Sequence, residues 1–179
     1  DTAEVKFDIH GADKDVNRSE RDVRKKVMTH LVVSGGTNLA SGLSLVSVVV
    51  DIERIGDYTK NIYDLAVHHP LRLQGGPVEE KLQKVEASVT TDFKGMIEVF
   101  KHRDEDKARA IMNNYKEGLS DACEEISNSI LSGDVTGLDS SDATAVSLYA
   151  RFLKRIASHS RNIVTSVVNP FHRIGYREK

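Results

Sequence analysis

Asp51-Ile52-Glu53-Arg54-Ile55-Gly56-Asp57, followed by Asn61-Ile62, is the most informative stretch of this 179-residue chain. It predicts a helix with Glu53 and Asp57 four residues apart, and side chains at i and i+4 share one helix face. Two like charges at that spacing repel each other, so the pair costs stability unless a positive group lies nearby. A metal ion or a basic partner would supply that positive group.

The rest of the chain reads as long helices, each with one apolar stripe. The third of them carries apolar residues at spacings of three and four from Val78 to Phe100, which is typical of a helix packed on one side. Gly35-Gly36 and Pro70 mark helix ends, and Thr37, Asn38, Asp104, Ser140 and Ser141 are candidates for helix starts. The predicted helices cover residues 9–33, 37 or 38 to 69, 78–102, 104–131 and 140 or 141 to 168.

The helix that contains the 51–57 motif, called the motif helix, is partly repeated later in the chain. Arg155-Ile156 and Asn162-Ile163 repeat Arg54-Ile55 and Asn61-Ile62 at a constant offset, and the apolar stripe is kept. The first stripe is Val48, Ile52, Ile55, Ile62 and Ala66, and the second is Tyr149, Leu153, Ile156, Ile163 and Val167. Helices of this kind bury their stripes against one another, so the sequence predicts an all-α bundle.

Composition excludes several classes of protein. A net charge of −2 gives no sign of the basic surface that binds nucleic acids. The single cysteine, Cys123, excludes an internal disulfide and fits a reducing compartment. The longest strongly apolar run, residues 43–50, is too short to cross a membrane. No phosphate-cradling loop follows Gly35-Gly36, and no nucleophile motif surrounds any Ser, so no enzyme activity is predicted.

The motif stretch closely resembles the signature of the PhoU family, helical regulators of phosphate uptake. Asp51, Glu53, Arg54, Gly56, Asp57, Asn61 and Ile62 all match as they stand. The resemblance implies a PhoU-like helical bundle of two three-helix repeats. We therefore expect a first repeat over residues 1–103 with three helices. The second, degenerate repeat over residues 104–179 would have two, because its last helix is short or missing.

The resemblance also implies a metal site, since family carboxylates from the first two helices of a repeat can hold metal clusters. The candidates here are Asp13, Asn17, Glu20, Glu53 and Asp57. Oxygen ligands of this kind suit magnesium, and iron, manganese or zinc also accept carboxylates.

Ion pairing is the alternative for the same carboxylates. Arg24 stands where many family members have a further acidic residue, and it would pair with Glu53 or Asp57, as would Arg54 or Lys60. In the second repeat, Lys154 and Ser158 replace Glu53 and Asp57, so a symmetrical carboxylate site is not expected there. The positive charges of that segment are read as a solvated face.

By resemblance, the function is non-enzymatic regulation of inorganic phosphate uptake and of phosphate-starvation signalling on the cytoplasmic side of the membrane. The implied partners are a phosphate transporter and a sensor histidine kinase, with a homodimer as a further expectation. Two alternatives stay open: the cytoplasmic domain of a sodium–phosphate cotransporter, which the absence of Met at Asp1 permits, and a metal-binding accessory protein.

Overall fold

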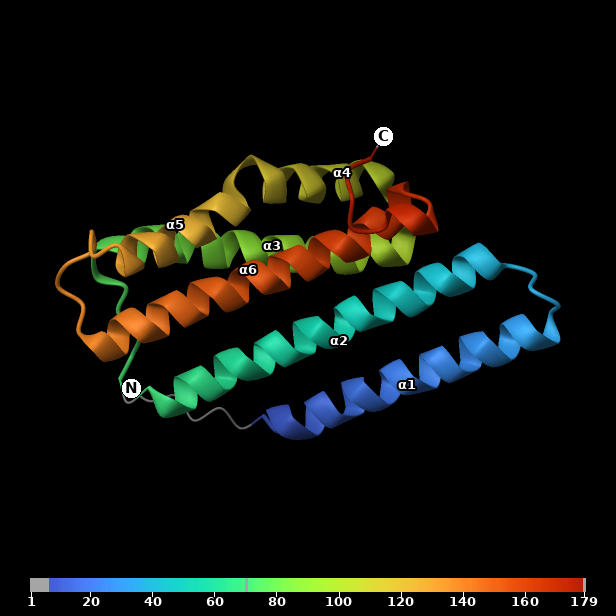
Figure 1. Ribbon diagram of the computed structural model, residues 1–179, viewed down its shortest axis with the longest axis horizontal. Coiled ribbons are helices and arrows are strands. Elements are labelled where there is room, and N and C mark those ends of the chain that lie inside the picture. The colour runs from blue at the N-terminus through green and yellow to red at the C-terminus, as the bar shows by residue number, and fades with distance from the viewer. Residues whose placement is uncertain (1–6, 70, 179) are drawn as a thin grey trace.

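The computed structural model describes residues 7–69 and 71–178, and this part of the chain contains helices and turns but no strand (Figure 1). The all-α prediction is therefore confirmed. The helices are α1 (Ile9–Val33), α2 (Leu39–His68), α3 (Glu79–His102), α4 (Glu105–Asn114), α5 (Ser120–Leu131) and α6 (Ser140–Val168). Short 3₁₀ turns at Gly76–Val78 and Phe171–Arg173 precede α3 and follow α6.

The helix ends follow the local chemistry of the sequence. After α1, Gly35 and Gly36 adopt φ angles of 63° and 85°, a left-handed backbone that residues with a Cβ rarely tolerate. The Asp104 side chain accepts a hydrogen bond of 3.0 Å from the backbone N–H of Lys107, which confirms it as the cap of α4. The cap of α6 is Asp139 rather than a serine, and its side chain accepts from the N–H of Asp142 at 2.8 Å.

The prediction of one continuous helix over residues 104–131 is wrong in its middle. A π-helical segment, Tyr115–Leu119, separates α4 from α5, and Gly118 within it has non-helical backbone angles. The apolar spacing through Ile111, Tyr115 and Leu119 could not reveal this, because a single inserted residue shifts the later apolar positions by less than one helix face.

α6 is the central element, with α2 packed on one side of it and α3, α4 and α5 on the others. α1 packs on the far side of α2, so α6, α2 and α1 lie side by side with α1 at the outer edge (Figure 1). α3 packs with the helices that follow it. The division of the chain at residues 103 and 104, which groups α3 with α1 and α2, stays a prediction.

Burial is uneven across this arrangement. One continuous apolar core joins α3, α4, α5 and α6 with the inner face of α2, and Val99, Ile126 and Ile163 in it are completely buried. α1 has 25 residues and contributes no buried residue at all. The α1–α2 pair is therefore covered on one side only.

The sequence repeat allows the burial of equivalent residues in α2 and α6 to be compared. α6 repeats α2 at an offset of 101 residues, since Arg155 follows Arg54 by that number. Leu153 of α6 is 5% exposed, whereas its equivalent in α2, Ile52, is 40% exposed. Val146 is 0% exposed, and its equivalent Leu45 is 40% exposed. The two motif helices therefore carry similar stripes, but Leu45 and Ile52 of α2 are exposed where their equivalents in α6 are buried.

This difference predicts unequal effects of truncation on stability. We expect Leu153→Ala to lower the free energy of unfolding by about 3 kcal/mol, because it opens a cavity in the core. Ile52→Ala should lower it by about 1 kcal/mol, because a side chain that is already partly in water loses less. Urea unfolding followed by circular dichroism measures both, and equal losses would contradict the unequal burial.

Candidate functional site

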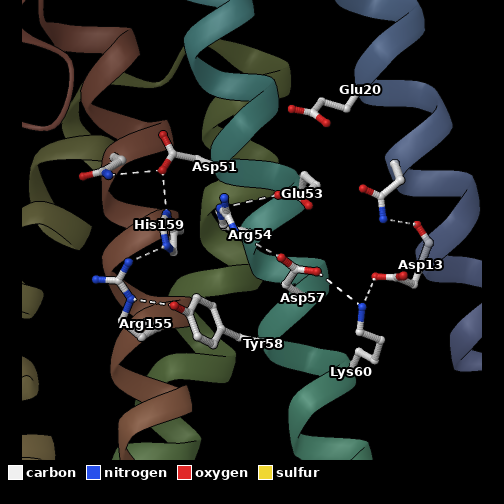
Figure 2. Close-up of polar contacts among 12 residues, drawn as sticks. Asp13, Glu20, Asp51, Glu53, Arg54, Asp57, Tyr58, Lys60, Arg155 and His159 are labelled. Atoms are coloured by element: carbon white, nitrogen blue, oxygen red, sulfur yellow. Dashed lines mark hydrogen bonds and ion pairs between the residues drawn. The ribbon is translucent and has the colours of Figure 1, made fainter.

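Glu53 and Asp57 of the motif lie on the face of α2 that meets α1, close to the acidic residues of α1 (Figure 2). Gly56 faces Val16 of α1, and a Cβ added to Gly56 would lie 3.7 Å from the Val16 side chain, an ordinary van der Waals distance. Two chain segments that are about 40 residues apart in sequence therefore bring their charges together here.

Cations of the chain itself pair with these carboxylates. The Nζ of Lys60 lies 2.9 Å from Oδ1 of Asp13 and 3.4 Å from Oδ1 of Asp57, so one ammonium bridges the two helices (Figure 2). Arg54 contacts Asp57 at 3.3 Å and Glu53 at 3.6 Å. The ion-pair alternative of the sequence analysis is confirmed for Arg54 and Lys60.

The other two candidates on α1 have partners of their own. Glu20 pairs with Arg24 at 2.8 Å, so Arg24 neutralises its own helix neighbour rather than Glu53 or Asp57. The side-chain amide of Asn17 donates to the backbone carbonyl of Asp13 at 3.0 Å, a local bond within the helix. Asn17 thus has its side chain engaged by the backbone of α1.

These contacts test whether the five residues fit a metal ion. In residues 7–69 and 71–178, no group of three His, Cys, Asp or Glu side chains is placed to hold one. A cation site built from carboxylates also needs their lone pairs free, and here ammonium and guanidinium groups take them. The arrangement does not fit a metal bound by three protein ligands, and the assignment of ligands remains a prediction.

Among these carboxylates, Glu53 is the one whose charge is opposed by burial and by its acidic neighbours. Burial raises the pKa of this carboxyl, and the neighbouring Asp57 and Glu20 charges raise it further, while Arg54 acts in the opposite direction. The like-charge cost read from the sequence is therefore present at Glu53 and only partly offset by its cation.

A second polar cluster, the Asp51–His159 network, joins α2 to α6, and the sequence analysis did not identify it. Asp51 and His159 are both buried, and Oδ1 of Asp51 lies 2.7 Å from Nδ1 of His159 (Figure 2). The side-chain amide of Asn162 donates to the same oxygen at 3.1 Å. His159 is thus an interior residue at the contact of the two motif helices.

The network fixes the tautomer of His159. The Nη2 of Arg155 lies 3.2 Å from Nε2 of His159, and a guanidinium can only donate, so Nε2 accepts. Nδ1 then carries the proton and donates to Asp51. Arg155 also donates from Nε to the Tyr58 hydroxyl at 3.1 Å, and Tyr58 stacks on His159 with 5.8 Å between ring centroids.

The positive charges of α6 are correspondingly not a simple solvated face. Lys154 forms an ion pair with Glu124 of α5, and the guanidinium of Arg161 lies 5.5 Å from the centre of the Tyr115 ring. Arg155 belongs to the Asp51–His159 network. The signal that could have found this network was the motif aspartate at position 51, which matches the family pattern but has no partner in its own helix.

Removing Asp51 should destabilise the protein. Asp51→Ala leaves the N–H of His159 and the amide of Asn162 without an acceptor in a buried place, and we expect a loss of about 2 kcal/mol. Asp22→Ala on the exposed surface of α1 is the matched control, with an expected change within about 0.5 kcal/mol. Urea unfolding at pH 7 measures both, and equal small changes would show that the network adds nothing.

Relieving the repulsion at Glu53 should stabilise the protein. The folded-state pKa of Glu53 is raised above its ordinary value of 4.5, so its charged form disfavours folding at neutral pH. Glu53→Gln should therefore raise the free energy of unfolding by about 0.3 kcal/mol at pH 7. The gain should fade as the pH falls through the folded pKa and below 4.5, where Glu53 is protonated in both states. A gain that persists at low pH would point to a cause other than charge.

Comparisons with known proteins agree with the motif. Residues 2–66 and 82–167 match the PhoU domain. The first match includes all of α1 and most of α2, and the second runs from within α3 into α6, so both motif helices are included. No curated protein and no solved structure matches the chain. The two matched segments together cover most of the sequence, and the chain therefore belongs to the PhoU domain family.

Proposed function

We propose that this protein is a non-enzymatic regulator of inorganic phosphate uptake and of phosphate-starvation signalling. It acts at the cytoplasmic side of the membrane through contacts with a phosphate transporter and a sensor histidine kinase. The observation that carries the proposal is the match of two segments to the PhoU domain, a domain of phosphate-transport regulation. None of the helices in the described part of the chain has the length and apolar character needed to cross a bilayer.

The paired charges between α1 and α2 suit a role in protein contacts. Arg54 is half exposed, and its pairs with Glu53 and Asp57 lie at the edge of the bundle. Ion pairs in such places are worth at most about 1 kcal/mol, so exchanging one counter-ion for another costs little. A basic group of a partner can therefore replace Arg54 on Asp57 without disturbing the fold. Exchange of this kind sets the rate and the orientation of docking more than its affinity.

A strain without this gene tests the regulatory role. Grown with ample phosphate, it should express its phosphate-starvation genes, and the intact gene should restore repression. The double variant Glu53→Gln, Asp57→Asn should restore repression only in part, because it removes the charges that a basic partner would contact. Asp22→Asn, which removes an exposed charge elsewhere on α1, should restore it fully.

Transcript levels of the starvation genes are the measurement, with the amount of each variant protein checked in parallel. Unchanged expression of these genes in the deletion strain would contradict the proposed signalling role. Full repression by the double variant would agree with the regulatory role but would show that the partner does not contact Glu53 and Asp57.

A further inference from the structure

The segment that follows α6 is anchored to the end of that helix and returns toward α4 (Figure 1). The buried side chain of Asn169 donates to the backbone carbonyls of Arg173 and Tyr176, at 3.1 and 2.9 Å. The backbone N–H of Gly175 donates to the hydroxyl of Thr165, a completely buried residue, at 2.7 Å. Because these partners are buried side chains, the segment has a fixed place on the bundle.

The anchored segment ends on Arg109 of α4. Arg109 donates from Nε and Nη2 to the two carboxylate oxygens of Glu178, in both cases at 2.8 Å. A guanidinium group recognises phosphate with the same pair of parallel hydrogen bonds. The bonds from Arg109 lower the pKa of the Glu178 carboxyl, so Glu178 is charged at neutral pH. The chain thus places an anion of its own on Arg109.

A cavity with polar walls lies at this contact. Arg109 and Glu178 both line it, and its volume of about 490 Å³ is within the range of roughly 300–1,000 Å³ that is usual for small-molecule sites. The π-helical segment Tyr115–Leu119 contributes Tyr115 and Lys116 to the wall. Insertions of this kind inside helices occur frequently at functional sites, because they redirect side chains that a regular helix would spread apart.

The cavity has an excess of positive charge. Its basic lining residues are Arg109, Lys116, Arg161 and Arg177. Its acidic lining residues are Asp121 and Glu178. Among residues 7–69 and 71–178, Arg109 alone of the four cations has a carboxylate within ion-pair distance. Three cations are therefore gathered around one cavity without a counter-ion from the described part of the chain.

Arg161 is already oriented for an anion. Its guanidinium lies 5.5 Å from the centre of the Tyr115 ring, and this cation–π contact holds the half-buried side chain in place. The contact uses no N–H group, and none of the other described residues accepts a hydrogen bond from the Arg161 side chain. A guanidinium that is held in place with its N–H groups free favours an oxyanion, because charge-assisted hydrogen bonds are the strong ones.

We propose that this cavity, the α4–α6 cavity, binds a small anion that carries a diphosphate group. Lys116, Arg161 and Arg177 bind its oxygens, and Glu178 competes with it for Arg109. A diphosphate suits the cavity better than a single phosphate, since it has more charge and more volume and offers oxygens to cations from three parts of the chain. Free pyrophosphate and a nucleoside diphosphate share this group. The inference does not depend on the proposed role in phosphate regulation.

Isothermal titration calorimetry of the 179-residue chain tests the proposal, at low ionic strength and without divalent cations. Pyrophosphate and ADP are the probes, and we expect saturable binding with one site per chain. Inorganic phosphate and AMP should bind more weakly by about tenfold, because each lacks one phosphate group and its charge-assisted hydrogen bonds. ADP binding tighter than pyrophosphate would support a nucleoside diphosphate as the ligand, and the reverse order would support free pyrophosphate.

Variants of single charges locate the binding. Lys116→Met and Arg161→Met should each weaken pyrophosphate binding by about tenfold, because each removes a cation from the cavity. Arg151→Met is the matched control, since it removes an exposed cation of α6 outside the cavity, and its affinity should be unchanged. Lys116 is exposed, so its variant keeps the test decisive even if circular dichroism shows that Arg161→Met is unfolded.

A variant of the competing carboxylate should act in the opposite direction. Glu178→Gln should strengthen pyrophosphate binding by about threefold, because it frees Arg109 from an exposed ion pair. A role of Glu178 in holding the fold alone would not produce this gain.

Three results would overturn the proposal. The first is the absence of saturable binding of pyrophosphate and ADP. The second is inorganic phosphate binding as tightly as pyrophosphate, because a diphosphate group would then not be required. The third is an equal loss of affinity in Lys116→Met and Arg151→Met, which would mean a diffuse attraction to the surface of the protein.

Discussion

The packing of α2 on α6 is the contact on which the rest of the molecule depends. These two helices carry the repeated motif, and each also holds the remaining helices of its own side, α1 on α2 and α3 to α5 on α6. At their contact, Asp51 accepts hydrogen bonds from His159 and Asn162 in a buried place. Buried polar groups are costly when unpaired, so only the register that satisfies all three is favourable. The network therefore fixes how the two motif helices meet.

The charges of the motif serve a different purpose from that of Asp51. Glu53 and Asp57 lie on the other side of α2, toward α1, where Arg54 and Lys60 balance their charges. One short stretch of sequence thus supplies a buried aspartate for the interior and two carboxylates for the edge. The helical period separates these roles, because positions 51 and 53 point in different directions whereas 53 and 57 point in the same one.

The two motif helices are covered unequally by the rest of the fold. α6 is enclosed by four helices, and its small and aliphatic residues are buried on nearly every side. α2 has α6 on one side and α1 on the other, and α1 buries none of its own residues. The exposed apolar side chains of α2, such as Leu45 and Ile52, cost stability because they remain in water.

The sequence by itself determined the helices, their ends and the repeat. Apolar spacing and local signals such as Asp104 and Gly35-Gly36 act within a few residues, so they can be read without the fold. The interruption at Gly118 was missed because a π segment hardly changes that spacing. Glu20, Glu53 and Asp57 pair with cations of their own helices, whereas only the tertiary structure brings Lys60 to Asp13 across 47 residues. Which helices become neighbours also decides the pairing of Asp51 with His159, the burial of α6 and the exposure of Leu45 and Ile52 on α2. No single segment of the sequence specifies its neighbour.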